Sequence, residues 1–319
     1  MNNSRASQDC THPAIKRRNL PWGGLIAIFL LLAAGFQALG GEKGKEVTSA
    51  NKKSRRIAIT FDELPAARGF GDIDRTAITY LTLQALNKHK VQATGFVVGE
   101  YIGDAYDILG QWLNDGHILG NLTYSYQDYN QLDAENFISD ISAGQDALET
   151  MLAGFGQKKR YFRYPFLHYG TTVESKREVE NYLEARELTA VPATVIVEDY
   201  VYNLSLEKMG KVPDSTKFFD LMNDYLNHVL DEVERSERLS QEILNRPCRH
   251  ILLLRANRLN AVFLDEMLTA LEEMGFEFIT LPNALKDKLY LEPEAYFGLK
   301  GISYLDMIRL SDPDLLPAK

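Results

Sequence analysis

Short apolar segments alternate with longer amphipathic segments along most of the chain. The apolar segments predict strands over residues 56–61, 91–98, 117–120, 161–165, 189–197, 251–254 and 276–281. The amphipathic segments predict helices over residues 74–89, 104–115, 134–152, 214–243 and 264–274. Seven strands separated by helices predict an α/β domain with a parallel sheet. We expect this domain to cover residues 55–310, with a short tail over 311–319, and its ligand site to lie at the carboxyl ends of the strands.

The N-terminal segment has the pattern of an export signal. Residues 19–41 contain no charged side chain and directly follow Lys16, Arg17 and Arg18. This order is typical of a secretory signal peptide, and the segment also has the length of about 20 residues that a membrane-spanning helix needs. Residues 1–41 are therefore expected to be either a cleaved signal peptide or a membrane anchor, and 42–54 a polar tether. The domain is then periplasmic or otherwise extracytoplasmic.

The net charge and the cysteine content exclude one class of partner and one class of fold. The chain of 319 residues has a formal net charge of −9. Residues 1–56 hold 10 Lys or Arg and 3 Asp or Glu, so the other 263 residues carry a net charge of −16. Nucleic acid is not expected as a partner, because its binding depends on basic side chains. Cys10 and Cys248, the two cysteines, lie on either side of the export segment and exclude a disulfide-based fold.

Five segments at the predicted strand ends resemble the motifs of a known family. They are Thr60-Phe61-Asp62-Glu63, the segment 120–126, Phe162-Arg163-Tyr164-Pro165, the segment 194–203 and Leu254-Arg255. In this order and spacing they resemble the polysaccharide deacetylases, also called the NodB-homology domain or carbohydrate esterase family 4. The resemblance covers nearly the whole domain and implies a distorted (β/α)7 barrel.

The resemblance also implies a reaction: metal-dependent hydrolysis of N-acetyl groups, whose C–N bonds are not peptide bonds, on glycans. In the family an Asp and two His bind a divalent metal, commonly zinc. Another Asp is the general base, a His is the general acid, and an Arg paired with an Asp orients the base. The base position is kept here as Asp62 and the orienting position as Arg163.

Most other working positions of the family are changed in this chain. The metal-binding Asp is replaced by Glu63, and the two metal-binding His positions hold Leu122 and Tyr126. Arg255 replaces the general-acid His, and Ile196 replaces the Asp that pairs with the orienting Arg. A catalytic zinc normally has three protein ligands, and Leu122 has no donor atom. We therefore expect no bound metal and no other cofactor, with Arg255 pairing with Asp62 or Glu63.

The neighbouring acids Asp62 and Glu63 form an unpromising acid/base pair. Adjacent residues of a strand point to opposite faces, so their carboxyl groups are expected to lie apart. Tyrosines gather near the strand ends, and their rings suit stacking on sugars. Tyr126, Tyr164 and Tyr200 are the candidate substrate-binding residues.

Three hypotheses remain open from the sequence. The first is a catalytically degenerate deacetylase of carbohydrate metabolism or envelope glycan processing, which binds an N-acetylated glycan or an active envelope enzyme. The second is a weak or metal-independent glycan deacetylase or hydrolase that uses Asp62, Arg163 and Arg255. The third is a structural barrel within an envelope complex.

Overall fold

The strands of the domain form one parallel sheet. The computed structural model describes residues 55–66, 74–210 and 214–311. Within them every strand pairing is parallel. The strands are β1 (Arg55–Leu64), β2 (Thr94–Val97), β3 (Ile118–Asn121), β4 (Arg160–Phe162), β5 (Leu188–Ala190), β6 (Val195–Ile196), β7 (Arg249–Arg255) and β8 (Phe276–Phe278).

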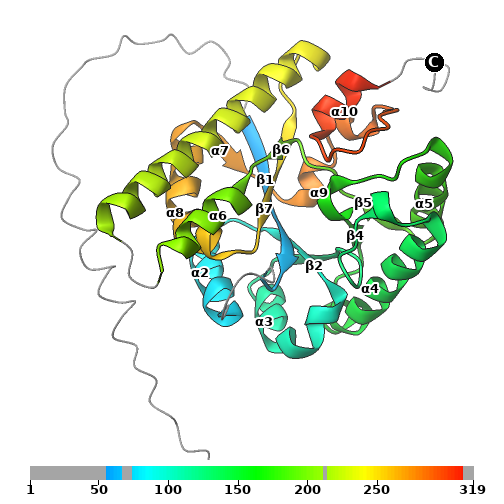
Figure 1. Cartoon of the computed structure of the whole chain (residues 1–319), viewed down its shortest axis with the longest axis horizontal. Helices are drawn as coiled ribbons and strands as arrows, with labels where there is room; N and C mark the ends of the chain where they lie inside the picture. Colours follow the sequence, from blue (N-terminus) through cyan, green and yellow to red (C-terminus); the bar gives the residue numbers. More distant parts are fainter. Residues whose placement is uncertain (1–54, 67–73, 211–213, 312–319) are drawn as a thin grey trace, which may run out of the picture. The chain divides into compact units, whose positions relative to one another are not determined.

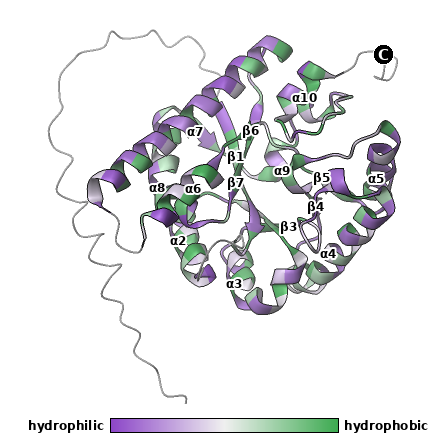
Figure 2. Ribbon diagram, in the orientation of Figure 1, coloured by the Kyte–Doolittle hydropathy of each residue, from purple (hydrophilic) through white to green (hydrophobic). Residues whose placement is uncertain are grey.

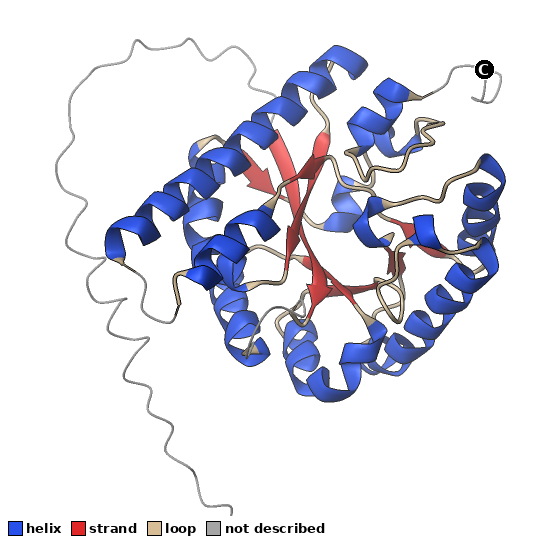
Figure 3. Ribbon diagram, viewed as in Figure 1, coloured by secondary structure: helices blue, strands red, loops and turns tan. Residues whose placement is uncertain are grey.

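The sheet curls into a half-barrel that stays open on one side. Its order is β5-β4-β3-β2-β1-β7-β6, and β8 pairs with the start of β1. The edge strands β5 and β6 do not pair with each other, so the seam between them is open. Helices surround the outside of the sheet (Figures 1 and 3). This arrangement agrees with the expected distorted (β/α)7 barrel.

Most of the helices connect successive strands on the outer side of the sheet. They are α2 (Arg75–Lys88), α3 (Ile102–Asn114), α4 (Ala134–Gly154), α5 (Val173–Ala185), α6 (Asp199–Lys208), α7 (Ser215–Leu244), α8 (Arg258–Glu273), α9 (Leu281–Ala284) and α10 (Tyr304–Leu310). Short 3-10 turns cover Gly99–Tyr101, Tyr129–Gln131, Pro165–Leu167 and Lys288–Leu291.

Alternation along β1 separates the outer core from the barrel interior. Ile57, Ile59 and Phe61 belong to the large core that the outer helices complete. Ala58 belongs to a second apolar cluster with residues of β2, β3 and β7. Asp62 has the same parity as Ala58, so its side chain lies on the interior side, at the carboxyl end of the strand. Figure 2 shows hydrophobic colour on the strands and on helix faces turned toward them.

The predicted fifth strand, 189–197, was wrong as one element. The structure contains two short strands, β5 and β6, separated by residues 191–194. Pro192 lies in that interval, and proline cannot donate a hydrogen bond to a sheet. Helices α5, α6, α9 and α10 were not predicted, and α8 begins at Arg258 rather than 264. Asn257 caps α8 by accepting a hydrogen bond from the Asn260 backbone N–H at 2.9 Å.

A segment near the C-terminus packs against residues beside the open seam between β5 and β6. The backbone N–H of Tyr304 donates to the carbonyl oxygen of Ala193 at 2.8 Å. Gly301 packs so closely that a Cβ there would lie 1.9 Å from the carbonyl oxygen of Phe166. The C-terminal segment therefore contacts the loop between β5 and β6 and the turn after β4, although the sheet itself does not close.

Several sequence expectations fall outside this part of the chain. The signal or anchor over 1–41, the tether over 42–54 and all of the tail beyond residue 311 lie outside the described residues. Among the helices that are described, none combines the length and apolar character needed to cross a bilayer.

Candidate functional site

Asp62 and Arg163 form a buried ion pair inside the barrel. Arg163 follows β4, and its Nη1 donates to Asp62 Oδ1 and to Thr60 Oγ1, both at 2.8 Å. Its Nε donates to the carbonyl oxygen of Val191 at 3.2 Å, and its guanidinium lies 4.2 Å from the ring centroid of Phe96. Arg163 is fully buried, so these contacts fix the orientation of the Asp62 carboxyl group.

The Glu63 carboxyl group lies in the same cluster as Asp62, contrary to the expectation from strand alternation. Glu63 has φ 65°, in the left-handed region, and the register between β1 and β2 shifts between Phe61 and Leu64. This irregularity ends the alternation. The Glu63 carboxyl group accepts a hydrogen bond from the Tyr126 hydroxyl and lies 3.4 Å from Arg255 Nε, and Arg255 stands opposite Asp62 in the β1–β7 register. Both acids therefore belong to one cluster at the end of β1.

Arg255 holds the Glu63 carboxylate on one side and Asp199 on the other. It ends β7, opposite Asp62 in the β1–β7 register. Its Nη1 donates to Asp199 Oδ1 at 2.7 Å, and its Nε lies 3.4 Å from Glu63 Oε1. Burial opposes the charge of Arg255, but Asp199 and the other neighbouring acids outweigh it and raise its pKa above the usual value. Arg255 is therefore a permanent cation within the cluster.

Asp199 is a central residue that sequence reasoning missed. It is the first residue of α6 and is fully buried. Its Oδ2 accepts hydrogen bonds from the Arg255 backbone N–H at 2.7 Å and from Asn260 Nδ2 at 2.6 Å. An acidic residue at the start of a helix is a usable sequence signal. It went unnoticed because α6 itself was not predicted.

Leu122 and Tyr126 fill the positions that resemble the family's histidines. Leu122 is fully buried in the interior apolar cluster. The Tyr126 hydroxyl donates to Glu63 Oε1 at 3.0 Å. Burial, followed by the charges of Glu63 and Asp62, raises the pKa of Tyr126 well above its ordinary value. Its phenol therefore stays protonated and acts as a hydrogen-bond donor.

Burial shifts both acids of the cluster toward their neutral forms. Burial raises the pKa of Asp62, against the opposing effect of Arg163. Burial also raises the pKa of Glu63, opposed by Arg255 and by the hydrogen bond from Tyr126. Each carboxyl group therefore holds its proton at a higher pH than it would in water.

The candidate ligand-binding tyrosines differ in exposure. Tyr164 is only 4% exposed and stacks with Tyr129 and Phe137 between the sheet and α4. Strand alternation places Tyr164 on the face opposite Arg163, so its ring does not face the ligand site. Tyr200 is 49% exposed, and the Arg255 guanidinium lies 5.3 Å from its ring centroid. The Tyr126 ring is tilted against the exposed ring of Phe166, with the ring centroids 4.7 Å apart.

The side chains in this cluster do not fit a divalent metal ion. Leu122 offers no donor, the Tyr126 phenol is protonated, and Arg255 brings a positive charge beside Glu63. In the part of the chain that the structure describes, no three His, Cys, Asp or Glu residues converge as a metal site would require. The cluster is a set of ion pairs and hydrogen bonds at the mouth of the barrel.

The fold and the position of this cluster define a class of α/β barrel proteins with a site at the strand ends. Residues 49–186 match the sequence model of the polysaccharide deacetylases. This region of the chain is therefore similar to the polysaccharide deacetylases, and proteins similar to the chain include peptidoglycan-N-acetylglucosamine deacetylases of Bacillus cereus and Listeria monocytogenes.

Curated relatives of the chain are bacterial proteins of low identity. An uncharacterized 30.6 kDa protein of Geobacillus stearothermophilus is 24% identical over 244 residues, which are 76% of this chain and 75% of that protein. A peptidoglycan-N-acetylglucosamine deacetylase of Bacillus cereus is 29% identical over 135 residues, 42% of this chain. The matched region spans only 44% of that enzyme and 42% of a chitooligosaccharide deacetylase from Rhizobium leguminosarum.

Solved structures share the fold at low sequence identity. A peptidoglycan N-acetylglucosamine deacetylase superimposes with a TM-score of 0.52 at 21% identity, over 73% of this chain and 88% of that chain. A protein described as a CE4 family pseudoenzyme, from Bacillus anthracis, gives a TM-score of 0.51 at 17% identity, over 73% of this chain and 66% of that chain. At these identities the structural similarity concerns the fold alone.

Proposed function

We propose that this protein binds an N-acetylated glycan at the carboxyl ends of its strands without hydrolysing it. The observation that carries the proposal is the position of Arg255, whose guanidinium pairs with Glu63 and with the buried Asp199. This pairing places a fixed cation where the family resemblance implies a proton-donating histidine. An arginine side chain cannot supply a proton near neutral pH.

The retained part of the site supports ligand positioning. Arg163 still orients Asp62 through a bond of 2.8 Å. Five non-glycine residues near the strand ends keep left-handed backbone angles, namely Glu63, Thr123, Tyr126, Phe166 and Leu167. Such angles are costly and cluster at functional sites. The frame of a binding site is thus kept although the chemistry of its side chains has changed.

Exposed aromatic rings supply the surface for sugar binding. Tyr200 and Phe166 are 49% and 43% exposed beside the cluster. Aromatic rings combine a large apolar face with specific geometry, which suits the C–H face of a hexose. The relatives named as deacetylases of peptidoglycan and of chitooligosaccharides indicate the class of glycan to test first.

Export is part of the proposal. Residues 19–41 are uncharged behind a basic cluster, so we infer that the domain acts outside the cytoplasm, attached to the membrane if the segment is retained. A reporter that works only outside the cytoplasm should therefore be active when it is fused after residue 60, and a reporter that works only inside the cytoplasm should be inactive there. In that location the partner is the glycan itself or an active envelope enzyme.

The decisive experiment measures binding and hydrolysis on the same preparation. The full chain in detergent is titrated with N-acetylglucosamine oligomers by calorimetry, and acetate release is measured in parallel with added zinc. We expect binding without acetate release, with affinity reduced by Tyr200→Ala. Acetate release that disappears with Asp62→Asn would instead favour a weak or metal-independent hydrolase. Absence of both would leave only a structural role in an envelope complex.

A further inference from the structure

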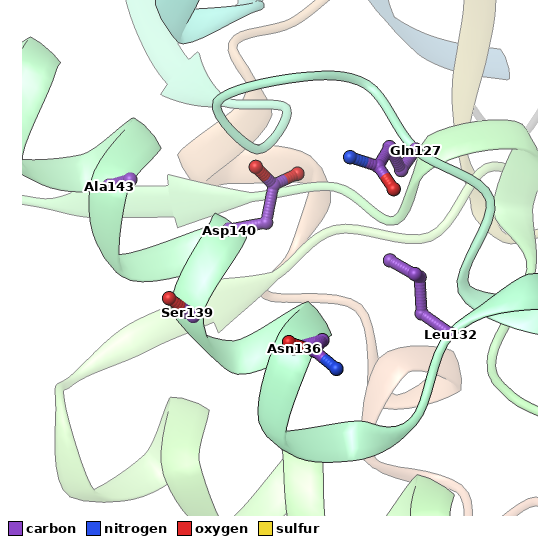
Figure 4. A pocket seen from close by; sticks show the side chains of 6 residues that line it. All are labelled: Gln127, Leu132, Asn136, Ser139, Asp140 and Ala143. Carbon is purple, nitrogen blue, oxygen red and sulfur yellow. The ribbon is translucent and has the colours of Figure 1, made fainter.

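A separate hollow lies between α4 and the loop that follows β3. It has a volume of about 240 Å³ and is lined by Gln127, Leu132, Asn136, Ser139, Asp140 and Ala143. Figure 4 shows Gln127 and Leu132 on the loop and the other four side chains on the helix, with Asp140 directed toward the loop. The hollow is open to solvent on one side, and its volume leaves room for one sugar ring.

The lining side chains have unused hydrogen-bonding groups. Gln127 donates from Nε2 to Ser125 Oγ at 3.0 Å, and Asn136 donates from Nδ2 to Asp133 Oδ2 at 2.8 Å. Within residues 74–210 and the other described ranges, Gln127 Oε1, Asn136 Oδ1 and the Ser139 hydroxyl have no protein partner. Gln127, Asn136 and Ser139 are exposed, so two amide oxygens and a hydroxyl face solvent and can accept hydrogen bonds from a ligand.

Contacts between the loop and the helix hold this lining in place. Ser125 donates from Oγ to Asp140 Oδ1 at 2.8 Å, and its backbone N–H donates to the same carboxylate at 3.2 Å. The Tyr124 backbone N–H donates to the Asp140 carbonyl oxygen at 3.0 Å. Asp133 caps α4 through the Asn136 backbone N–H at 2.8 Å. The hollow is therefore largely formed before any ligand arrives, which lowers the entropic cost of binding.

The charge of the hollow narrows the kind of ligand. Asp140 is the only charged residue of its lining, and Ser125 already donates to this carboxylate. A bound anion would lie beside a carboxylate without a basic partner in the lining, which is unfavourable. Leu132 and Ala143 add an apolar surface of limited size. Hydroxyl donors on a compact ring with an apolar face match this combination.

We propose that this hollow is a second saccharide-binding position for a neutral hexose unit. Ring hydroxyls donate to Gln127, Asn136 and Ser139, while the C–H face lies against Leu132. The inference rests on the proposed glycan binding at the barrel mouth and extends it. Tyr126, at the mouth, is followed directly in the chain by Gln127, so one loop serves both positions. A longer oligosaccharide therefore gains contacts that a short one lacks.

The test fills the hollow with a side chain. Ala143 is exposed on α4, and Ala143→Trp places an indole in the hollow. Thr150→Trp is the matched control, because Thr150 is exposed two turns further along the same helix and outside the lining. The full chain in detergent is titrated by calorimetry with the hexamer and the dimer of N-acetylglucosamine, and folding is checked by circular dichroism.

We expect Ala143→Trp to weaken hexamer binding at least about tenfold and to leave dimer binding within twofold. Thr150→Trp should bind both ligands as the natural chain does. Equal hexamer affinity for the natural chain and Ala143→Trp would overturn the second position while leaving the proposed function intact. No binding of either ligand by the natural chain would overturn both. Backbone hydrogen exchange gives an independent measurement: the hexamer, but not the dimer, should slow exchange in residues 125–143.

Discussion

Replacement of Arg255 tests the physical basis of the site most directly. Asp199 is fully buried, and its Oδ1 accepts the Arg255 Nη1–H at 2.7 Å. We predict that Arg255→Met strongly destabilises the fold, because it removes the counter-charge of a buried carboxylate. Arg255→Lys is the matched control, since it keeps a positive charge but loses the planar donor geometry.

The expected loss of unfolding free energy depends on the hydrogen bonds that Asp199 retains in the variant. Removal of one partner from a buried ion pair costs about 3–5 kcal/mol. Asp199 Oδ2 retains hydrogen bonds from the Arg255 backbone N–H at 2.7 Å and from Asn260 at 2.6 Å. The side chain of Arg255 is also 22% exposed, so water enters part of the gap. We therefore expect about 3 kcal/mol for Arg255→Met and a smaller loss for Arg255→Lys.

Urea unfolding at pH 7, followed by circular dichroism, measures these losses. Asp199→Asn is added to the natural chain and to Arg255→Met, which completes a double-mutant cycle. The Asn side chain removes the unpaired charge, so the double variant should be more stable than Arg255→Met alone. A loss below about 1 kcal/mol for Arg255→Met, or no recovery in the double variant, would refute the reasoning.

The same ion pair determines how a metal site could be rebuilt in this chain. A histidine at 255 would leave Asp199 unpaired, so the change needs Asp199→Asn beside it. We expect stoichiometric zinc and weak acetate release from the combined variant, and neither from any single change, because such residues act as a unit. The combined variant carries Glu63→Asp, Leu122→His, Tyr126→His, Ile196→Asp, Asp199→Asn and Arg255→His. A folded combined variant without zinc would show that these strand-end positions do not form a metal site together.

Three further predictions concern stability. Burial lowers the pKa of His117 and of His250 to about 4, so below pH 6.5 the unfolded chain binds more protons than the folded chain. The free energy of unfolding should therefore fall by about 2 kcal/mol for each histidine between pH 7 and pH 5. Urea titrations at the two pH values that show no such fall would contradict this. Burial raises the pKa of Glu63 above 4.5 in the folded chain, so the natural chain loses stability as the pH rises from the ordinary carboxyl pKa to the folded one. Glu63→Gln should therefore become more stable relative to the natural chain as the pH rises above 4.5, and a stability difference that stays constant with pH would refute the shift. Gly301→Ala should cost about 1–3 kcal/mol by thermal or urea unfolding, because its Cβ meets a backbone oxygen at 1.9 Å, whereas the control Gly103→Ala meets nothing within 4 Å and should be near neutral.

The sequence predicts the barrel well where strands are regular. Alternation along β1 and β4 places Asp62 and Arg163 in the interior, and the structure joins them at 2.8 Å. The same alternation, applied to Tyr164, would have placed it outside, where it packs in an aromatic cluster. That error came from grouping tyrosines by position along the chain rather than by strand face.

The site was less predictable where the backbone departs from regular geometry. The left-handed angle of Glu63 ends the strand alternation, and its carboxyl group contacts Tyr126 and Arg255; no residue type in the sequence signals such an angle for a glutamate. Asp199 begins α6 directly after the short strand β6, and the prediction of one strand over 189–197 did not include a helix start there. Both residues depend on irregular segments, for which periodicity carries no information.

The changed positions depend on one another. Tyr126 donates to Glu63, Glu63 pairs with Arg255, and Arg255 neutralises Asp199. Asn260 then donates to Asp199 and accepts from the buried Tyr225 hydroxyl, so the network continues from the barrel mouth to α7. Replacement of any one of these side chains by the residue of the family pattern leaves a neighbouring buried group without its partner. The free-energy cost of that unpaired group exceeds what the hydrogen bond or ion pair contributed. The cluster is therefore stable as a whole, and single substitutions toward the deacetylase pattern should reduce stability before they add any activity.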